Sequence, residues 1–409
     1  MFNPTEFLNS LIELFGTPEL RSRVLTVLIG AGIVGVAGGK MWERLGSSTI
    51  RELKADLKKA EDERDAAAAD LLVAQTELGT LQTEFRYIND LRAAVHGEQE
   101  EVWNLKKSMP PIDFYARMMR GALKIITVCN QKGGVGKTTL VACLAAYFET
   151  VLNLRVLVID FDYQGSQTRM LLRAANAKLG DDLLSEKLLG GGNDAKWAVK
   201  GRELTSVLPN TRLVTCGQTF EAYEWRQLLL WLLQDEGDDI RFRLADLMIA
   251  DYARNNYDVV LIDAPPRQSL GTVNALCASH AIIVPTVLDE LSAETVRRFL
   301  QRVNSKLRPL NPALTFAGVV GTMTEQSKLK PHEEKALEIA ERGLQLWDGN
   351  QGNKQRFNNH IRHFTALSQN AGKKIGYFEN DDVQRAFNAL GNEIADKLGI
   401  KKRIQELAS

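Results

Sequence analysis

A glycine-rich loop between an apolar run and a helical pattern constrains this chain more than any other feature. Residues 123–128, LKIITV, are apolar and rich in β-branched side chains, which predicts a buried strand. They lead into CNQKGGVGKTTLVACLAAYF, where a glycine-rich turn precedes a helix-like run. Glycines in such a turn let backbone N–H groups point at phosphate oxygens, and the helix N-terminus adds its dipole. The segment therefore predicts a phosphate-binding loop in an α/β domain.

The loop departs from the standard spacing G-x-x-x-x-G-K-[ST], because Gln131 stands where its first glycine is expected. Instead, Lys132 and Lys137 bracket the glycines. This arrangement resembles the deviant Walker A loop, K-G-G-x-G-K-[ST]-[ST], of the ParA/MinD family of ATPases. In either version of the loop, Lys137 is expected to offer a cation to the β and γ phosphates of ATP. The Thr138 hydroxyl is expected to bind Mg²⁺. The residues predicted to bind the nucleotide are Gly133, Gly134, Val135, Gly136, Lys137, Thr138 and Thr139.

A second segment, residues 155–168, reads RVLVIDFDYQGSQT. It resembles the family motif in which a buried strand delivers Asp-x-Asp and then a Pro-Gln-Gly turn to the active site. The aspartates here are Asp160 and Asp162, and Tyr163 stands where proline is usual. The resemblance implies that Asp162 orients the water that attacks ATP. The tyrosine leaves the geometry of the turn open.

A third segment, residues 257–271, reads YDVVLIDAPPRQSLG and resembles a Walker B strand. Its apolar run ends at Asp263. An aspartate at the carboxyl edge of a strand can hold a water of the Mg²⁺ shell. We therefore predict that Thr138, Asp263 and Asp160 form the metal site.

The resemblance covers roughly residues 123–398. Alternating buried strands and helices predict an α/β three-layer domain with a mainly parallel sheet at 123–409. In the family, the first lysine of the loop reaches the nucleotide of a second subunit, so the resemblance implies a homodimer in which two chains sandwich ATP. The catalytic residues it implies are Lys132, Lys137 and Asp162, with slow, partner-stimulated ATP hydrolysis.

An apolar run precedes this domain. Residues 24–39, VLTVLIGAGIVGVAGG, carry no charge, and Met41 and Trp42 extend the run past Lys40. A helix over 24–42 rises about 28 Å, close to the hydrocarbon thickness of a bilayer. We therefore predict a transmembrane helix at 24–42; a buried or interfacial helix is the alternative. The amphipathic segment 1–23 is either a helix on the membrane surface or a loose tail.

Basic residues set the predicted orientation. They are denser after the span than before it, which places the large C-terminal part in the cytoplasm. The predicted location is the bacterial inner membrane, with a single pass and a cytoplasmic ATPase domain.

A heptad pattern follows, and it predicts a coiled-coil helix over residues 48–109. Its a and d positions are Ile50, Leu53, Leu57, Ala60, Arg64, Ala67, Leu71, Ala74, Leu78, Leu81, Phe85, Ile88, Arg92, Val95, Gln99 and Val102. The flanking e and g residues form no opposite-charge pairs in a parallel homodimer, so the partner stays open. A parallel dimer, a hetero-partner, a higher oligomer and a fold-back hairpin are all compatible with the pattern, as is a solitary helix.

Composition excludes some classes of protein. The 51 basic and 51 acidic residues balance, which argues against general coating of nucleic acid or of an acidic membrane. The four cysteines, Cys129, Cys143, Cys216 and Cys277, lie far apart, which argues against a disulfide framework, a zinc site or an iron-sulfur cluster. They are expected to be reduced thiols.

Several functions remain open from the sequence. The first is a membrane-anchored ATPase that positions, assembles or regulates a partner complex. The second is a DNA- or plasmid-partition ATPase, with Arg362, Lys373 and Lys374 as the nearest DNA-binding candidates. The third is a membrane-linked tyrosine kinase, but only Tyr377 lies beyond residue 257, so the usual C-terminal tyrosine cluster is absent. The fourth is a nucleotide-gated scaffold of a defence or secretion machine.

Overall fold

The computed structural model describes residues 47–97, 99–179, 184–233, 237–326, 328–344, 347, 356–370 and 372–404. The chain divides into two compact units, Met1–Asp90 and Leu91–Ser409. The predicted amphipathic segment 1–23 and the predicted transmembrane helix 24–42 lie outside the described residues.

The predicted location in the bacterial inner membrane is corrected by the structure. Within the described ranges, no helix is both long enough and apolar enough to cross a bilayer. Helix α4 (Ser47–His96) has the length, at 50 residues, but it carries charged side chains along much of its course. Burying such charges in hydrocarbon is unfavourable, so α4 is not a membrane span.

Helix α4 confirms that the heptad segment is helical, although its end differs from the prediction. The helix ends at His96, and a 3₁₀ helix, η1 (Gln99–Asn104), follows Gly97. Glycine costs about 1 kcal/mol in a helix interior, which favours an end here. The seam residues Leu71, Leu78, Leu81 and Phe85 are between 55% and 64% exposed. The pairing of α4 as a coiled coil stays a prediction.

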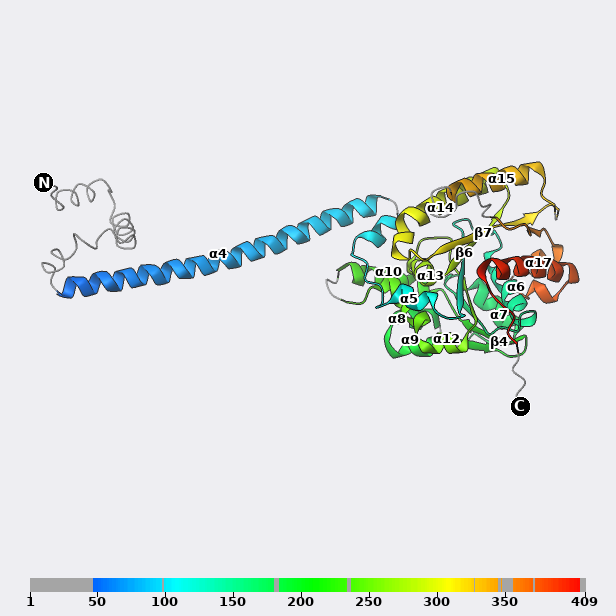
Figure 1. Cartoon of the computed structure of the whole chain (residues 1–409), viewed down its shortest axis with the longest axis horizontal. Coiled ribbons are helices and arrows are strands. Elements are labelled where there is room, and N and C mark those ends of the chain that lie inside the picture. Colours follow the sequence, from blue (N-terminus) through cyan, green and yellow to red (C-terminus); the bar gives the residue numbers. More distant parts are fainter. Residues whose placement is uncertain are drawn as a thin grey trace. The chain divides into compact units, whose positions relative to one another are not determined.

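The second unit contains an eight-stranded sheet in the order β3-β4-β2-β5-β1-β6-β7-β8. Figure 1 shows helices such as α6 (Lys137–Thr150), α13 (Leu270–Ala278) and α17 (Asp381–Leu398) packed around this sheet. Its strands are β1 (Lys124–Val128), β2 (Val156–Asp160), β3 (Arg202–Leu204), β4 (Leu208–Val214), β5 (Val259–Asp263), β6 (Ala281–Val287), β7 (Thr315–Thr324) and β8 (Ile361–Arg362). All neighbours pair in parallel except β3 with β4. The prediction of a mainly parallel α/β sheet is confirmed.

Alternation along the central strands creates two hydrophobic cores, one on each face of the sheet. In β1, for example, Ile125 belongs to one core and Ile126 to the other. The helices of the first core are α5 (Phe114–Met119), α8 (Leu184–Gly190), α9 (Gly192–Ala198), α10 (Thr219–Leu233), α11 (Arg243–Ile249), α12 (Asp251–Asn256), α13 (Leu270–Ala278), α14 (Glu290–Arg302) and α15 (Pro331–Glu341). The helices of the second are α6 (Lys137–Thr150), α7 (Ser166–Ala174) and α17 (Asp381–Leu398). The sheet with a layer of helices on each face is the predicted three-layer arrangement. The short helix α16 (Thr365–Asn370) precedes α17.

The second unit begins earlier than the ATPase domain predicted from residue 123. Trp103 is only 3% exposed and belongs to the first core, as do Phe114 and Met118. The buried guanidinium of Arg241 donates to the carbonyl oxygens of Trp103 and, at 3.0 Å, Lys107. The segment between α4 and β1 is therefore an integral part of this unit.

Candidate functional site

The three predicted motifs meet at one edge of the sheet. Strand β1 lies between β5 and β6, and β5 lies between β1 and β2. In the register, Asp263 is opposite both Val128 and Asp160. Because these strands are parallel, the loop after β1 and the aspartates that end β2 and β5 share the carboxyl edge, where α/β sheets bind their ligands.

Glycine conformation shapes the loop. Gly134 and Gly136 have positive φ angles of 72° and 82°, a region that glycine enters at little cost. Helix α6 begins directly afterwards, at Lys137. Val135 is buried, and its carbonyl accepts a hydrogen bond of 2.9 Å from Thr322 Oγ1 on β7. The loop is thus anchored to the sheet at its midpoint.

Lys137 lies inside the loop, with only 7% of its surface exposed. Its Nζ donates to the carbonyl oxygen of Lys132 at 3.2 Å. Burial lowers the pKa of Lys137, while the nearby carboxyl groups of Asp263 and Asp162 oppose that shift. A buried cation enclosed by its own loop is suited to bind an incoming phosphate, which supplies a charge partner in place of the water that burial removes.

Thr138 and Asp263 lie together where a metal ion is predicted. Thr138 Oγ1 donates to Asp263 Oδ2 at 2.8 Å, and Asp263 is 1% exposed. Burial, and then the neighbouring carboxyl of Asp160, raise the pKa of Asp263. Hard oxygen ligands of this kind suit Mg²⁺, which typically takes one or two protein groups and completes its shell with phosphates and waters. The residues present therefore fit a Mg²⁺·nucleotide.

Asp160 has a different set of neighbours. Its Oδ2 accepts hydrogen bonds from the Thr168 backbone N–H (2.8 Å) and hydroxyl (2.7 Å), and its Oδ1 accepts from the Asp162 N–H (3.0 Å). Burial raises the pKa of Asp160, and these hydrogen bonds oppose it. In this structure Asp160 fastens the loop that carries Asp162; its predicted metal role stays a prediction.

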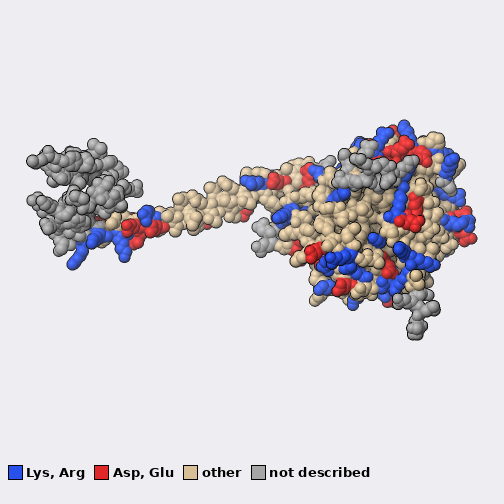
Figure 2. Space-filling model, in the orientation of Figure 1, with Lys and Arg blue, Asp and Glu red and all other residues tan. Residues whose placement is uncertain are grey.

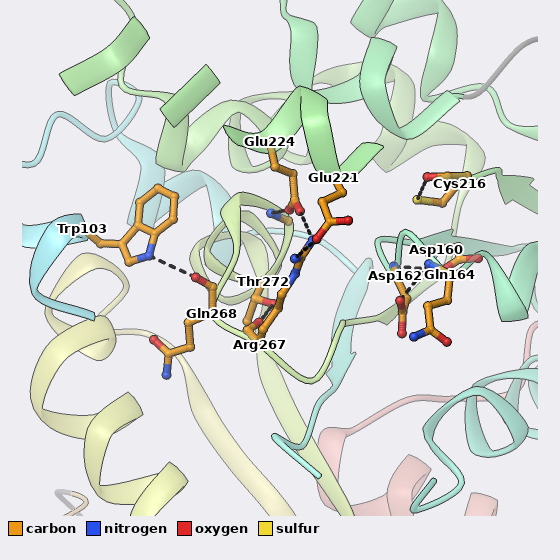
Figure 3. A network of polar contacts seen from close by, with 12 residues as sticks. Trp103, Asp160, Asp162, Gln164, Cys216, Glu221, Glu224, Arg267, Gln268 and Thr272 are labelled. Carbon is orange, nitrogen blue, oxygen red and sulfur yellow. Dashed lines mark hydrogen bonds and ion pairs between the residues drawn. The ribbon is translucent and has the colours of Figure 1, made fainter. Parts of the chain in front are cut away.

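Asp162 is half-buried, and one residue, Phe161, separates it from the end of β2. Its Oδ1 accepts the backbone N–H of Gln164 at 3.0 Å, which closes a tight turn (Figure 3). The second carboxylate oxygen, Oδ2, can therefore accept a hydrogen bond from a water molecule. Its role at the attacking water stays a prediction.

The Lys132 ammonium has different partners from that of Lys137. Its Nζ lies 2.5 Å from Ser292 Oγ and 3.6 Å from Asp289 Oδ2, and its side chain is 40% exposed. Asp289 caps α14 by accepting the Ser292 N–H at 2.8 Å. The two loop lysines therefore occupy separate environments, one enclosed and one at the rim.

Sequence reasoning missed Asn130, which organises the start of the loop. Its side-chain amide donates to Pro285 O at 2.8 Å, and its Oδ1 accepts the Lys132 N–H at 2.9 Å. Asn130 is 1% exposed, and its position just after a buried strand was the available signal.

The predicted DNA-binding candidates are partly neutralised. Arg362 lies 3.3 Å from Asp382, and Lys374 lies 2.9 Å from Glu379. Lys373 is exposed. Figure 2 shows basic and acidic side chains interspersed over the visible face of this unit.

Comparison with known proteins agrees with this geometry. A family model described as an AAA domain matches residues 123–316. The chromosome-partitioning ATPase Soj of Thermus thermophilus is 33% identical over 219 residues, covering 54% of this chain and 77% of that protein. The sporulation initiation inhibitor protein Soj of Bacillus subtilis is 31% identical, covering 49% and 73%. An ATP complex of McdA from Cyanothece shares the fold, with a TM-score of 0.51 and 16% identity, over 70% of this chain and 100% of that one.

The parallel sheet, the phosphate loop at the end of β1 and the aspartates beside it define a P-loop nucleotide-binding domain. The similarity to the Soj proteins assigns it more closely. The chain belongs to the ParA/MinD family of P-loop ATPases, as its sequence motifs predict.

Proposed function

We propose that this chain is an ATP-dependent dimerisation switch of the ParA/Soj kind, which binds ATP with Mg²⁺ and hydrolyses it slowly. The observation that carries the proposal is the separation of the two loop lysines. Lys137 is enclosed where the chain's own phosphates would bind, whereas Lys132 lies at the rim with a partly exposed side chain. One loop thus offers a cation to its own nucleotide and a second cation to the nucleotide of a facing chain.

The remaining groups supply positioning and charge. Lys137 would bind the β and γ phosphates, and Thr138 and Asp263, which are hydrogen-bonded to each other, would hold Mg²⁺. The chemistry that Mg²⁺ supplies when bound is neutralisation of charge on the transferring phosphoryl group. Asp162 orients the attacking water, from a turn fixed by Asp160. Phosphoryl transfer depends mainly on such positioning and electrostatic stabilisation.

DNA partition is the process that the similarity favours. The Thermus relative is named a chromosome-partitioning ATPase, and a partition ATPase is the alternative that the sequence already suggests. In this proposal the ATP-held dimer binds DNA. Because such binding releases counterions, retention of the dimer on duplex DNA should fall steeply as salt rises.

The exposed apolar seam of helix α4 supports a second part of the proposed function, which is binding of a partner helix. The apolar seam residues from Leu71 to Ile88 are exposed. Between residues 71 and 83 the helix carries a single charged side chain, Glu77. A regular apolar seam of this length typically packs against another helix. We propose that α4 joins the switch to that partner, so that the complex is positioned or assembled as ATP is turned over.

Two alanine variants test the switch on the chain as it stands. Lys137→Ala should abolish tight ATP binding, because the phosphates lose the enclosed cation. Lys132→Ala should bind ATP normally but fail to form the ATP-dependent dimer and should hydrolyse little ATP. Nucleotide binding, phosphate release and light scattering measure these outcomes. A Lys132→Ala chain that dimerises on ATP and hydrolyses it like the parent would refute the sandwich mechanism.

A further inference from the structure

The two loops that carry the site's aspartates touch through one stacking contact. Tyr163 directly follows Asp162 after β2, and Arg267 follows Asp263 by four residues after β5. The guanidinium carbon of Arg267 lies 4.4 Å from the centre of the Tyr163 ring. A planar guanidinium stacks well on an aromatic face. The loop that follows Asp263 therefore contacts Tyr163, the residue next to Asp162.

Helix α10 holds Arg267 in place. Arg267 Nη1 lies 2.6 Å from Glu221 Oε1, and Nη2 lies 3.1 Å from Glu224 Oε2 (Figure 3). The Glu224 side chain is 5% exposed, and its other oxygen accepts the Gly271 N–H at 2.7 Å. The Arg267 carbonyl also accepts the Thr272 hydroxyl at 2.7 Å. Glu221 and Glu224 therefore hold the guanidinium that stacks on the Tyr163 ring.

Phe161, the residue before Asp162, packs on the same helix, α10. Phe161 stacks on Phe220 of α10, with ring centres 5.8 Å apart and planes 7° apart. Asp162 therefore lies between two aromatic residues, and α10 supports both, one directly and one through Arg267. When packing holds the residues beside a functional group in one conformation, it also fixes the position of that group, here the Asp162 carboxylate.

We propose that Arg267 is a positioning residue for ATP hydrolysis, which acts on Asp162 by stacking against Tyr163. This inference rests on the proposed role of Asp162 in handling the attacking water. The contact keeps the turn after β2 in one conformation, so that the carboxylate is in place when the nucleotide binds. Displacement of a positioned group by about 1 Å can cost about a hundredfold in rate, so loss of the contact should lower kcat without loosening ATP.

A purely structural role for Arg267 predicts a different effect of its substitution. If Arg267 served only to pair with the buried Glu224, its loss would lower stability, and Tyr163 would be unimportant. If it positions Asp162, the ring and the guanidinium must act as one unit. Removing both should then cost no more than removing either one.

The experiment measures kcat and the Kd for ATP on the full chain. Arg267→Ala and Tyr163→Leu should each lower kcat about tenfold, with the Kd changed less than about twofold, and the double variant should be no slower than the slower single variant. Tyr163→Phe keeps the ring and should match the parent. Arg267→Lys keeps a positive charge beside the glutamates but loses the planar face, so it should fold like the parent and still lose several-fold in kcat.

Two results would overturn the inference: a parent-like kcat in Tyr163→Leu or Arg267→Lys, or a double variant whose loss is the product of the single losses. Asp162→Ala separates this outcome from failure of the proposed function. If the parent hydrolyses ATP and Asp162→Ala does not, a parent-like Arg267→Lys overturns the role of Arg267 alone. A parent without ATPase activity, or an active Asp162→Ala, overturns both.

Discussion

Helices α6 and α4 both carry a regular apolar pattern, yet their leucines have opposite surroundings. On α6, Leu140 and Leu144 are at most 1% exposed, because α17 and the sheet cover them. On α4, Leu78 and Leu81 are 55% and 61% exposed. A pattern of this kind therefore identifies a helix and its apolar face, but what covers that face depends on groups far away in the sequence or in another molecule.

The same substitution in both helices should give very different losses of stability. Leu144→Ala should lower the free energy of unfolding by about 2–5 kcal/mol, because it leaves a cavity in a close-packed core. Leu78→Ala should change it by less than about 0.5 kcal/mol, because the side chain is already hydrated. Urea unfolding followed by tryptophan fluorescence measures both. A loss above about 1 kcal/mol for Leu78→Ala would show that its seam is covered, either within the chain or by a second copy of it.

A buried histidine adds a pH dependence that belongs to the second unit alone. His280 Nδ1 accepts the Ile125 N–H at 3.1 Å, and Nε2 lies 2.9 Å from the Met118 carbonyl oxygen, which fits the neutral ring. Burial lowers the pKa of His280 to about 4. Between this value and the unfolded value of about 6.5, the unfolded chain binds the extra proton. The free energy of unfolding should therefore be highest above about pH 6.5 and fall as the pH drops towards 4, by on the order of 3 kcal/mol.

His280→Gln provides the matched control, because its amide can serve both neighbours without titrating. Its stability should be lower overall but should lose the part of the pH dependence that lies between about pH 4 and 6.5. An identical pH profile in the variant would assign that dependence to other groups.

Association that does not require nucleotide should depend on the seam of α4. Replacing Leu71, Leu78 and Leu81 by serine should weaken self-association or partner capture by at least about tenfold, because a polar seam cannot pack against a second helix. ATP binding should be unchanged. Analytical ultracentrifugation with and without nucleotide measures both states.

The matched control for the seam is an exposed leucine beside it. Leu72 is 66% exposed and follows the a position Leu71, so it occupies a b position on the outer side of the helix. Leu72→Ser should leave association unchanged. Unchanged association in the seam variant as well would make α4 a spacer.

The sequence motifs located the glycine-rich loop and the strand-end aspartates but not the side chains that support them, and the roles of these residues at a nucleotide stay predictions. Asp160 and Asp263 end strands β2 and β5, and Lys137 and Thr138 begin helix α6, so local motifs located them. The contact of Arg267 with Tyr163 joins segments about a hundred residues apart, and no local pattern specifies it.

The boundary of the second unit was missed for the same reason. Trp103 reads as part of a continuing heptad region, but it packs on Trp231, with ring centres 6.2 Å apart. Its indole Nε1 also donates to the Gln268 carbonyl at 3.4 Å. Such a long-range partner is visible only in the fold.

In the proposed mechanism ATP joins two copies of the second unit, and the mass of residues 91–409 in solution tests this most directly. This fragment has its own core and lacks most of α4, so helix pairing does not contribute. In the Asp162→Ala background, light scattering should give a monomer without nucleotide and a dimer with ATP and Mg²⁺, and adding Lys132→Ala should restore the monomer. A fragment that stays monomeric with ATP bound, or a dimer that is indifferent to Lys132→Ala, would contradict the account.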